Sequence, residues 1–145
     1  MAAAREGENP NNISPIFTYS LEGGVTVMWM GDLETEFIEA IKDDLNWPKA
    51  NILFAPHHGR YSGKVPEEVL AIINPDIVVI GEAPSEYLNY YEGYNTITQN
   101  SAGDITFDCL DRKAHIHVSE SDYSVDFLVD ESVGSQNYYL GTINL

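Results

Sequence analysis

Apolar residues in the first half of the chain gather into short runs that alternate with segments of helical periodicity. The runs at residues 16–21, 25–30, 51–55 and 77–80 have the length of β-strands. Glu22-Gly23-Gly24 separates the first two runs and is typical of a hairpin turn. Residues 77–80 are apolar without interruption, which indicates a strand that is buried on both faces.

Two segments between these runs repeat apolar residues every three or four positions and predict amphipathic helices. The first covers residues 34–45. The second begins at Pro66, a favoured first helical position, and ends at Asn74-Pro75. Strands and helices therefore alternate over residues 25–81, which predicts an α/β unit with a mixed sheet, parallel in its centre and flanked by helices.

The second half of the chain is β-rich in pattern. Residues 87–94 are aromatic and polar and predict a long loop. Short runs in which apolar and polar residues alternate predict strands at residues 104–109, 114–118, 123–129 and 138–143. The fold class expected from both halves is α/β with a β-rich C-terminal part.

The length and net charge of the chain predict a single acidic domain. The polar residues 1–14 predict a flexible arm, and a chain of 145 residues leaves 15–145 as a single domain with its own core. The 23 acidic and 7 basic residues give a formal net charge of −16. Lysine and arginine bind phosphate backbones, so we do not expect this chain alone to bind nucleic acid. The simplest role of the acidity is solubility.

Targeting signals and cysteine usage predict a cytoplasmic protein without membrane contact. No apolar run approaches the roughly 20 residues that cross a bilayer, and the first residues lack the apolar segment of a secretory signal. The single cysteine, Cys109, excludes an intramolecular disulfide and fits a reducing compartment. Cys109 alternates with Phe107 and is expected to be a buried apolar residue.

Polar residues that can bind a metal follow two of the predicted strands. Asp32 follows the strand at 25–30, and His57-His58-Gly59 follows the strand at 51–55. Strand ends in an open sheet direct side chains into a common crevice, and carboxylates and imidazoles bind divalent metal ions. The alternatives are that Asp32 caps the next helix and that both histidines are surface residues of a polar turn.

Three further groups of residues allow two interpretations each. His115-Ile116-His117 places two imidazoles on one face of a strand, but lies outside the α/β unit, and we expect both to face solvent. Residues 60–64 include Arg60 and Lys64, and form either a contact for an anionic substrate or an ordinary solvated loop. The tyrosines of the aromatic loop line either a substrate cleft or a protein interface. They are Tyr87, Tyr90, Tyr91 and Tyr94.

Several short motifs in the same order resemble the metallo-β-lactamase-fold hydrolases, and among these the hydrolase domain of the competence protein ComEC and its stand-alone relatives. The motifs are Gly31-Asp32-Leu33-Glu34, Pro56-His57-His58-Gly59 and the Asn74-Pro75-Asp76 turn into an apolar strand. An Asn-rich lead-in at residues 9–12 precedes them. The closing segment 139–143 also resembles the end of those relatives, and the main likeness spans residues 9–110.

The resemblance implies half of an αββα sandwich with a metal site. Asp32 would be the carboxylate that bridges two metal ions. One of His57 and His58 would be a metal ligand, and the other a hydrogen-bond donor or general acid. The metal would be zinc or manganese. The His-x-His-x-Asp-His cluster of the superfamily has no counterpart here, so a complementary half-domain would supply it.

Two functions follow from this resemblance. In the first, the chain is one part of a metal-dependent, phosphodiesterase-like hydrolase, inactive alone and active as a hetero-oligomer with the His-rich half. In the second, it keeps the half-fold as a non-catalytic binding or assembly module. The sequence given is also compatible with a piece of a longer hydrolase. Strong acidity and the lack of a histidine in the tyrosine segment 88–94 favour the second function.

Overall fold

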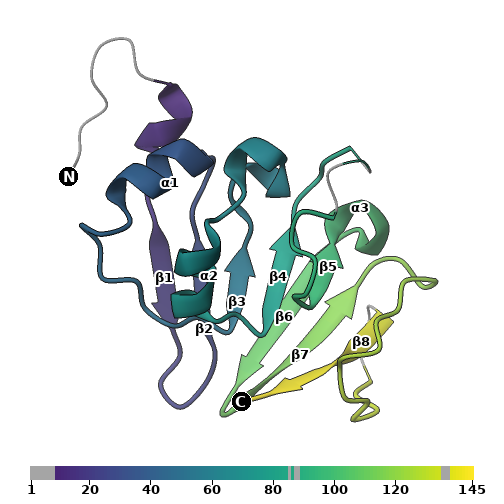
Figure 1. Cartoon of the computed structure of the whole chain (residues 1–145). Coiled ribbons are helices and arrows are strands. Elements are labelled where there is room, and N and C mark those ends of the chain that lie inside the picture. The colour runs from purple at the N-terminus through teal and green to yellow at the C-terminus, as the bar shows by residue number, and fades with distance from the viewer. Residues whose placement is uncertain (1–8, 85, 87–88, 135–137) are drawn as a thin grey trace.

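A five-stranded sheet in the order β1-β2-β3-β4-β5 organises the first two thirds of the chain. The computed structural model describes residues 9–84, 86, 89–134 and 138–145. The first pair of strands is antiparallel and the other neighbours are parallel (Figure 1). The strands are β1 (Phe17–Ser20), β2 (Thr26–Trp29), β3 (Ile52–Phe54), β4 (Ile77–Ile80) and β5 (Thr96–Thr98).

Helices α1 (Thr35–Ile41) and α2 (Glu67–Ile73) cover one face of this sheet, as the predicted alternation requires (Figure 1). Their apolar stripes meet the strands in one buried core, which includes Met28, Leu53 and Leu70. Lys42 follows α1 and forms an ion pair of 2.6 Å with Glu68 of α2. This pairing raises the pKa of Lys42 and lowers the pKa of Glu68. It ties the two helices together at their solvent side.

A second sheet lies on the other face and is antiparallel, in the order β6-β7-β8. Its strands are β6 (Ile105–Leu110), β7 (Lys113–Val118) and β8 (Tyr138–Asn144). Ala114, Ile116 and Val118 of β7 point inward and share a second core with Ile52 of β3 and Ile77 of β4. The molecule is therefore a mixed α/β protein with three layers: helices, a mixed sheet and a small antiparallel sheet (Figure 1).

The predicted elements differ from the structure at three places. The first helix ends at Ile41 rather than at residue 45. Residues 123–129 were predicted as a strand, which is wrong: only Val129 makes an isolated bridge, to Thr142. The short strand β5 and the one-turn helix α3 (Gln99–Ala102) were not predicted. The strands predicted at 16–21, 25–30, 51–55, 77–80, 104–109, 114–118 and 138–143 are confirmed to within two residues at each end.

Residues 9–14 pack against the domain. They contain the 3-10 helix η1 (Pro10–Ile13), and the Asn9 amide donates a hydrogen bond of 2.7 Å to Glu34. The rest of the predicted arm, residues 1–8, lies outside the described residues. Within the part of the chain that is described, no helix has the length and apolar character needed to cross a membrane.

Candidate functional site

Asp32 and His58 lie together at the carboxyl ends of two neighbouring parallel strands. Trp29 of β2 is in register with Phe54 of β3, so the loops that follow leave the sheet side by side. The His57 backbone N–H donates to the Gly31 carbonyl at 2.9 Å and joins these loops. As a result, His58 Nε2 lies 3.9 Å from Asp32 Oδ1, and both side chains are 51% exposed. A carboxylate and an imidazole thus face the same solvent-accessible space.

The backbone of the histidine turn, within the 3-10 segment η2 (Pro56–Gly59), adopts a costly conformation. Its last three residues have positive φ angles: 49° at His57, 59° at His58 and 80° at Gly59. Positive φ is unfavourable for residues with a Cβ and usually persists where the surroundings enforce it. Here Gly59 packs against Ile80, where an added Cβ would lie 2.8 Å from Cγ2. Such enforced conformations cluster at functional sites, which makes this turn a candidate.

The two histidines point in different directions. His57 Nδ1 lies 3.0 Å from Ser62 Oγ, in the 3-10 segment η3 (Tyr61–Gly63) that follows. His58 instead packs over Gly81, where an added Cβ would lie 3.1 Å from His58 Nδ1. The sequence left open which histidine faces the crevice. In the structure, His58 is the one beside Asp32.

Asp32 is not the cap of the following helix. The N-cap of α1 is Glu34, and that residue makes no side-chain capping bond. The Asp32 backbone N–H donates to Ser14 Oγ at 3.0 Å, while its carboxylate remains directed to solvent and His58. Gly31, with φ 57°, lies so close to Ser14 that a Cβ would meet the serine side chain at 2.6 Å. Ser14 therefore holds the Gly31-Asp32 turn in place.

An open pocket of about 480 Å³ borders His58 and extends along the same sheet edge. Its lining includes Arg60, Glu82 and Asn100, and Asn100 accepts a hydrogen bond of 2.9 Å from the Ala83 backbone N–H. The sequence-based prediction included Arg60 and missed Glu82 and Asn100. A signal for Glu82 existed, because it follows Gly81 at the end of β4 as Asp32 follows Gly31 after β2.

In the rest of the predicted polar loop, residues 61–64, some side chains are exposed and others make contacts within the protein. Tyr61 is 68% exposed and its ring lies 5.3 Å from that of Tyr90. Lys64 pairs with Glu67 at 2.9 Å, so its charge is already partly matched. Among the residues of this loop, Arg60 is the basic group that lines the pocket beside His58.

The side chains at this sheet edge are of the kinds that bind divalent metal ions. Carboxylate and imidazole donors suit zinc or manganese, and Asp32 and His58 supply one of each. No group of three or more His, Cys, Asp or Glu residues suited to a metal ion occurs among the described residues. On the residues described, this chain offers two neighbouring ligands.

His115 and His117 are buried, so the expectation that they face solvent is wrong. Each is only 7% exposed, although both lie on the outer face of the second sheet. The ring of Tyr139 on β8 lies 6.0 Å from the His115 ring and 5.5 Å from the His117 ring. His115 Nδ1 also lies 2.6 Å from Thr142 Oγ1. The sequence could not show this, because the covering residues come from β8 and from the loop before it.

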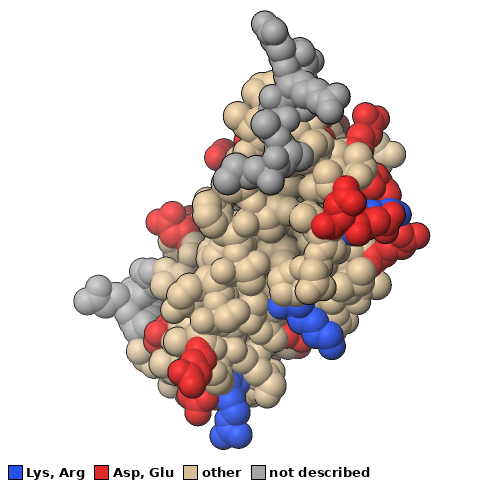
Figure 2. Space-filling view, turned by 90° about the vertical axis from the view of Figure 1, so that its left-hand side faces the viewer, with Lys and Arg blue, Asp and Glu red and all other residues tan. Residues whose placement is uncertain are grey.

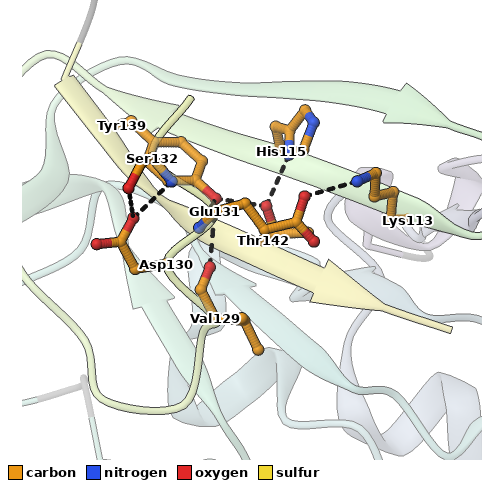
Figure 3. Close-up of polar contacts among 8 residues, drawn as sticks. All are labelled: Lys113, His115, Val129, Asp130, Glu131, Ser132, Tyr139 and Thr142. Atoms are coloured by element: carbon orange, nitrogen blue, oxygen red, sulfur yellow. Dashed lines mark hydrogen bonds and ion pairs between the residues drawn. The ribbon is translucent and has the colours of Figure 1, made fainter. Parts of the chain in front are cut away.

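Residues 129–132, here called the outer loop, are held beside these histidines by Tyr139 (Figure 3). The Tyr139 hydroxyl accepts from the Glu131 backbone N–H at 3.1 Å and donates to the Val129 carbonyl at 3.2 Å. Lys113 forms an ion pair of 2.6 Å with Glu131, which lowers the pKa of that carboxyl. His115 and His117 therefore belong to the packing of the second sheet.

Tyr91 and Tyr94 of the tyrosine segment pack on the core, and they also line an open pocket of about 310 Å³. Tyr91 is 2% exposed within the main core, and its hydroxyl accepts from the Val65 backbone N–H at 3.2 Å. Tyr94 packs partly buried against the same core, and Tyr87 lies outside the described residues. Cys109 is half-buried rather than buried, and burial, with a smaller contribution from Asp108, raises the pKa of its thiol.

Comparison of the chain with protein-family models, with curated proteins and with solved structures gave no match.

Proposed function

We propose that this chain is one part of a metal-dependent hydrolase whose remaining metal ligands come from a second polypeptide. The observation that carries the proposal is the approach of Asp32 and His58 to 3.9 Å at adjacent strand ends. Their identities and order agree with the resemblance to metallo-β-lactamase-fold hydrolases, in which the half-sandwich would be completed by a His-rich half-domain. Two neighbouring ligands are consistent with a shared site.

Asp32 and His58 would hold the ion, with the strained turn fixing the imidazole and Ser14 fixing the backbone of Asp32. A divalent ion bound there would supply activation of a water molecule for hydrolysis. His57, hydrogen-bonded to Ser62, is turned away and would position the turn rather than bind the ion. The hydrogen bond with Ser62 restrains the His57 ring and so helps to fix the turn that carries His58.

An anionic substrate of the phosphodiester class would find its positive contact at Arg60. This side chain lines the pocket next to His58, and guanidinium groups bind phosphate through paired hydrogen bonds. Glu82 lines the same pocket and opposes a highly charged substrate. The partner would therefore also contribute basic groups.

Native mass spectrometry of the protein purified from its source without chelator tests the proposal. A complex with a second chain and one or two transition-metal ions is the expected result. A metal-free monomer or homo-oligomer would contradict it and favour the assembly-module function, which the exposed aromatic residues described below would also suit.

Variants of the complex separate catalysis from assembly. Asp32→Ala and His58→Ala are expected to remove the bound metal and phosphodiester hydrolysis, each by at least about 100-fold, because each removes a metal ligand. Asp43→Ala, an exposed carboxylate after α1, is the matched control and should keep both. Full activity of Asp32→Ala would rule out its role as a ligand.

A further inference from the structure

Four aromatic side chains form a poorly covered surface on the mixed sheet, here called the aromatic face. They are Phe17 and Tyr19 of β1, Trp29 of β2 and Phe54 of β3. Phe17 is in register with Trp29, and Trp29 with Phe54, so these three point to the same side. Trp29 stacks on Phe54 at a centroid distance of 5.1 Å. Phe17 is 61%, Tyr19 55% and Trp29 38% exposed.

The aromatic face is exposed because the second sheet covers only part of the first. The inward residues of β7 are buried, whereas Ile105, Phe107 and Cys109 of β6 are half-buried. Phe107 reaches Phe54, with ring centroids 6.0 Å apart. The turn between β6 and β7 reaches the β1–β2 hairpin, where the Arg112 backbone N–H donates to the Gly23 carbonyl at 2.7 Å, but Phe17, Tyr19 and Trp29 stay exposed. Figure 1 shows the second sheet on the side of β4 and β5, with β1 at the opposite end of the mixed sheet. The space between the layers is thus filled at one end and open at the other.

Among the described residues, no strand pairs with the outer edge of the sheet beside this face. β1 is the terminal strand, all four of its residues are exposed, and its sequence, Phe-Thr-Tyr-Ser, carries no charge. Natural edge strands are commonly protected by charged side chains or proline, because an open edge can pair with another strand. An uncharged, aromatic edge in a chain with 21% charged residues is a candidate for pairing with a partner.

The charge around the aromatic face indicates which kind of partner can bind there. Figure 2 looks onto the end of the molecule that carries β1 and shows a broad uncharged surface, with many acidic side chains and fewer basic ones at its margins. A second copy would bring another net charge of −16 against these margins, and like charges across an interface are unfavourable. A partner with an apolar segment would cover the uncharged centre of this surface. Basic residues on both sides of that segment would pair with the acidic side chains at its margins.

We propose that the aromatic face and the open edge of β1 bind a different, positively charged polypeptide. The partner adds an extended apolar segment beside β1 and covers Phe17, Tyr19 and Trp29. Trp29 lies three residues before Asp32, so a segment bound here reaches the strand ends that carry the metal ligands. That this partner is also the one that completes the metal site rests on the proposed function; the docking itself does not.

Two designed peptides test the docking surface in the presence of chelator, which makes the result independent of the metal site. Both carry the same alternating Val-Thr-Val-Thr-Val core, and one is flanked by lysines and the other by glutamates. Amide shifts of the ¹⁵N-labelled protein are followed by NMR. The lysine peptide is expected to shift residues 17–20 and to bind at least tenfold more tightly than the glutamate peptide.

Matched variants place the binding on this surface. Tyr19→Ser is expected to weaken the lysine peptide at least fivefold, whereas Ser20→Ala, whose side chain leaves β1 on the opposite face, should bind as the unchanged protein does. No shift in β1 at 1 mM peptide, or equal binding of both peptides, would overturn the proposal. So would a homodimer in sedimentation that Tyr19→Lys dissociates, since a second copy would then be the occupant.

Discussion

At the scale of single residues, the glycine of the histidine turn is the position where backbone and packing both restrict substitution. Gly59→Ala is expected to lower the free energy of unfolding by about 1–2 kcal/mol or more, because φ is 80° and the new Cβ would press on Ile80. Urea denaturation measures the loss. Gly134→Ala is the control, since nothing lies within 4 Å of a Cβ there. Equal stability of the two variants would show that the turn is not constrained.

Tyr91 should make stability depend on alkaline pH. Burial raises the pKa of its phenol above the ordinary value of about 10, so the folded protein keeps a proton that the unfolded chain releases. The stabilisation is complete below pH 10 and falls as the pH rises towards the higher pKa of the folded state. Urea denaturation at pH 9 and 11 is expected to show this decrease.

A pair of variants assigns the alkaline effect. Tyr91→Phe removes the buried phenol and should reduce the pH dependence, while Tyr19→Phe, at an exposed position, should keep it. An unchanged pH dependence in Tyr91→Phe would assign the effect to other groups. The same burial explains why the aromatic pattern of this segment did not distinguish a core residue from a cleft residue.

The site residues that the sequence predicted are those set by local order along the chain. Asp32 and the histidine pair each follow an apolar strand, and parallel neighbours bring such positions together. Which histidine faces Asp32 depends on the φ angles of the turn and on contacts with Ser62 and Gly81. These contacts do not follow from any repeating pattern of residues, so the sequence alone could not show which histidine faces Asp32.

At the scale of elements, the outer loop is held to β8 by the backbone bridge between Val129 and Thr142 and by the Tyr139 hydroxyl. Tyr139→Phe removes the hydrogen bonds of this hydroxyl with Glu131, Val129 and Thr142 and is expected to cost about 1–2 kcal/mol of stability. Amide hydrogen exchange of residues 129–132 should accelerate correspondingly. Tyr138→Phe is the control, because Tyr138 is 58% exposed. Unchanged exchange in Tyr139→Phe would mean that the Val129–Thr142 bridge and the Lys113–Glu131 ion pair hold the loop without the hydroxyl.

The wrongly predicted elements are segments in which apolar residues recur as they would in a strand or helix, although the backbone forms neither. Residues 123–129 alternate as a strand does, and Tyr123, Phe127 and Leu128 do pack on the second core, yet they do so as a loop. Leu45 fits the helical spacing but is 41% exposed, and the helix ends before it. Apolar periodicity indicates which residues are buried. Here loop residues are buried without forming a strand or helix.

At the scale of the whole molecule, charge should govern stability and association together. A net charge of −16 makes the compact state repel itself, and salt screens this repulsion over about 10 Å at 0.1 M. Salt also weakens ion pairs such as Lys42–Glu68, but exposed pairs of this kind contribute little to stability. The repulsion involves many more groups than the few pairs, so the melting temperature is expected to rise between 20 and 500 mM NaCl.

A charge-altered variant determines whether this rise comes from self-repulsion. Asp43→Lys with Asp44→Lys changes two exposed carboxylates after α1 and makes the net charge less negative. Its melting temperature should therefore rise less with NaCl than that of the unchanged protein, in scanning calorimetry at constant pH. Asp43→Asn with Asp44→Asn should lie between the two. A melting temperature that falls with salt would show that ion pairs dominate, and the same rise in all three proteins would show that the effect of salt does not come from net charge.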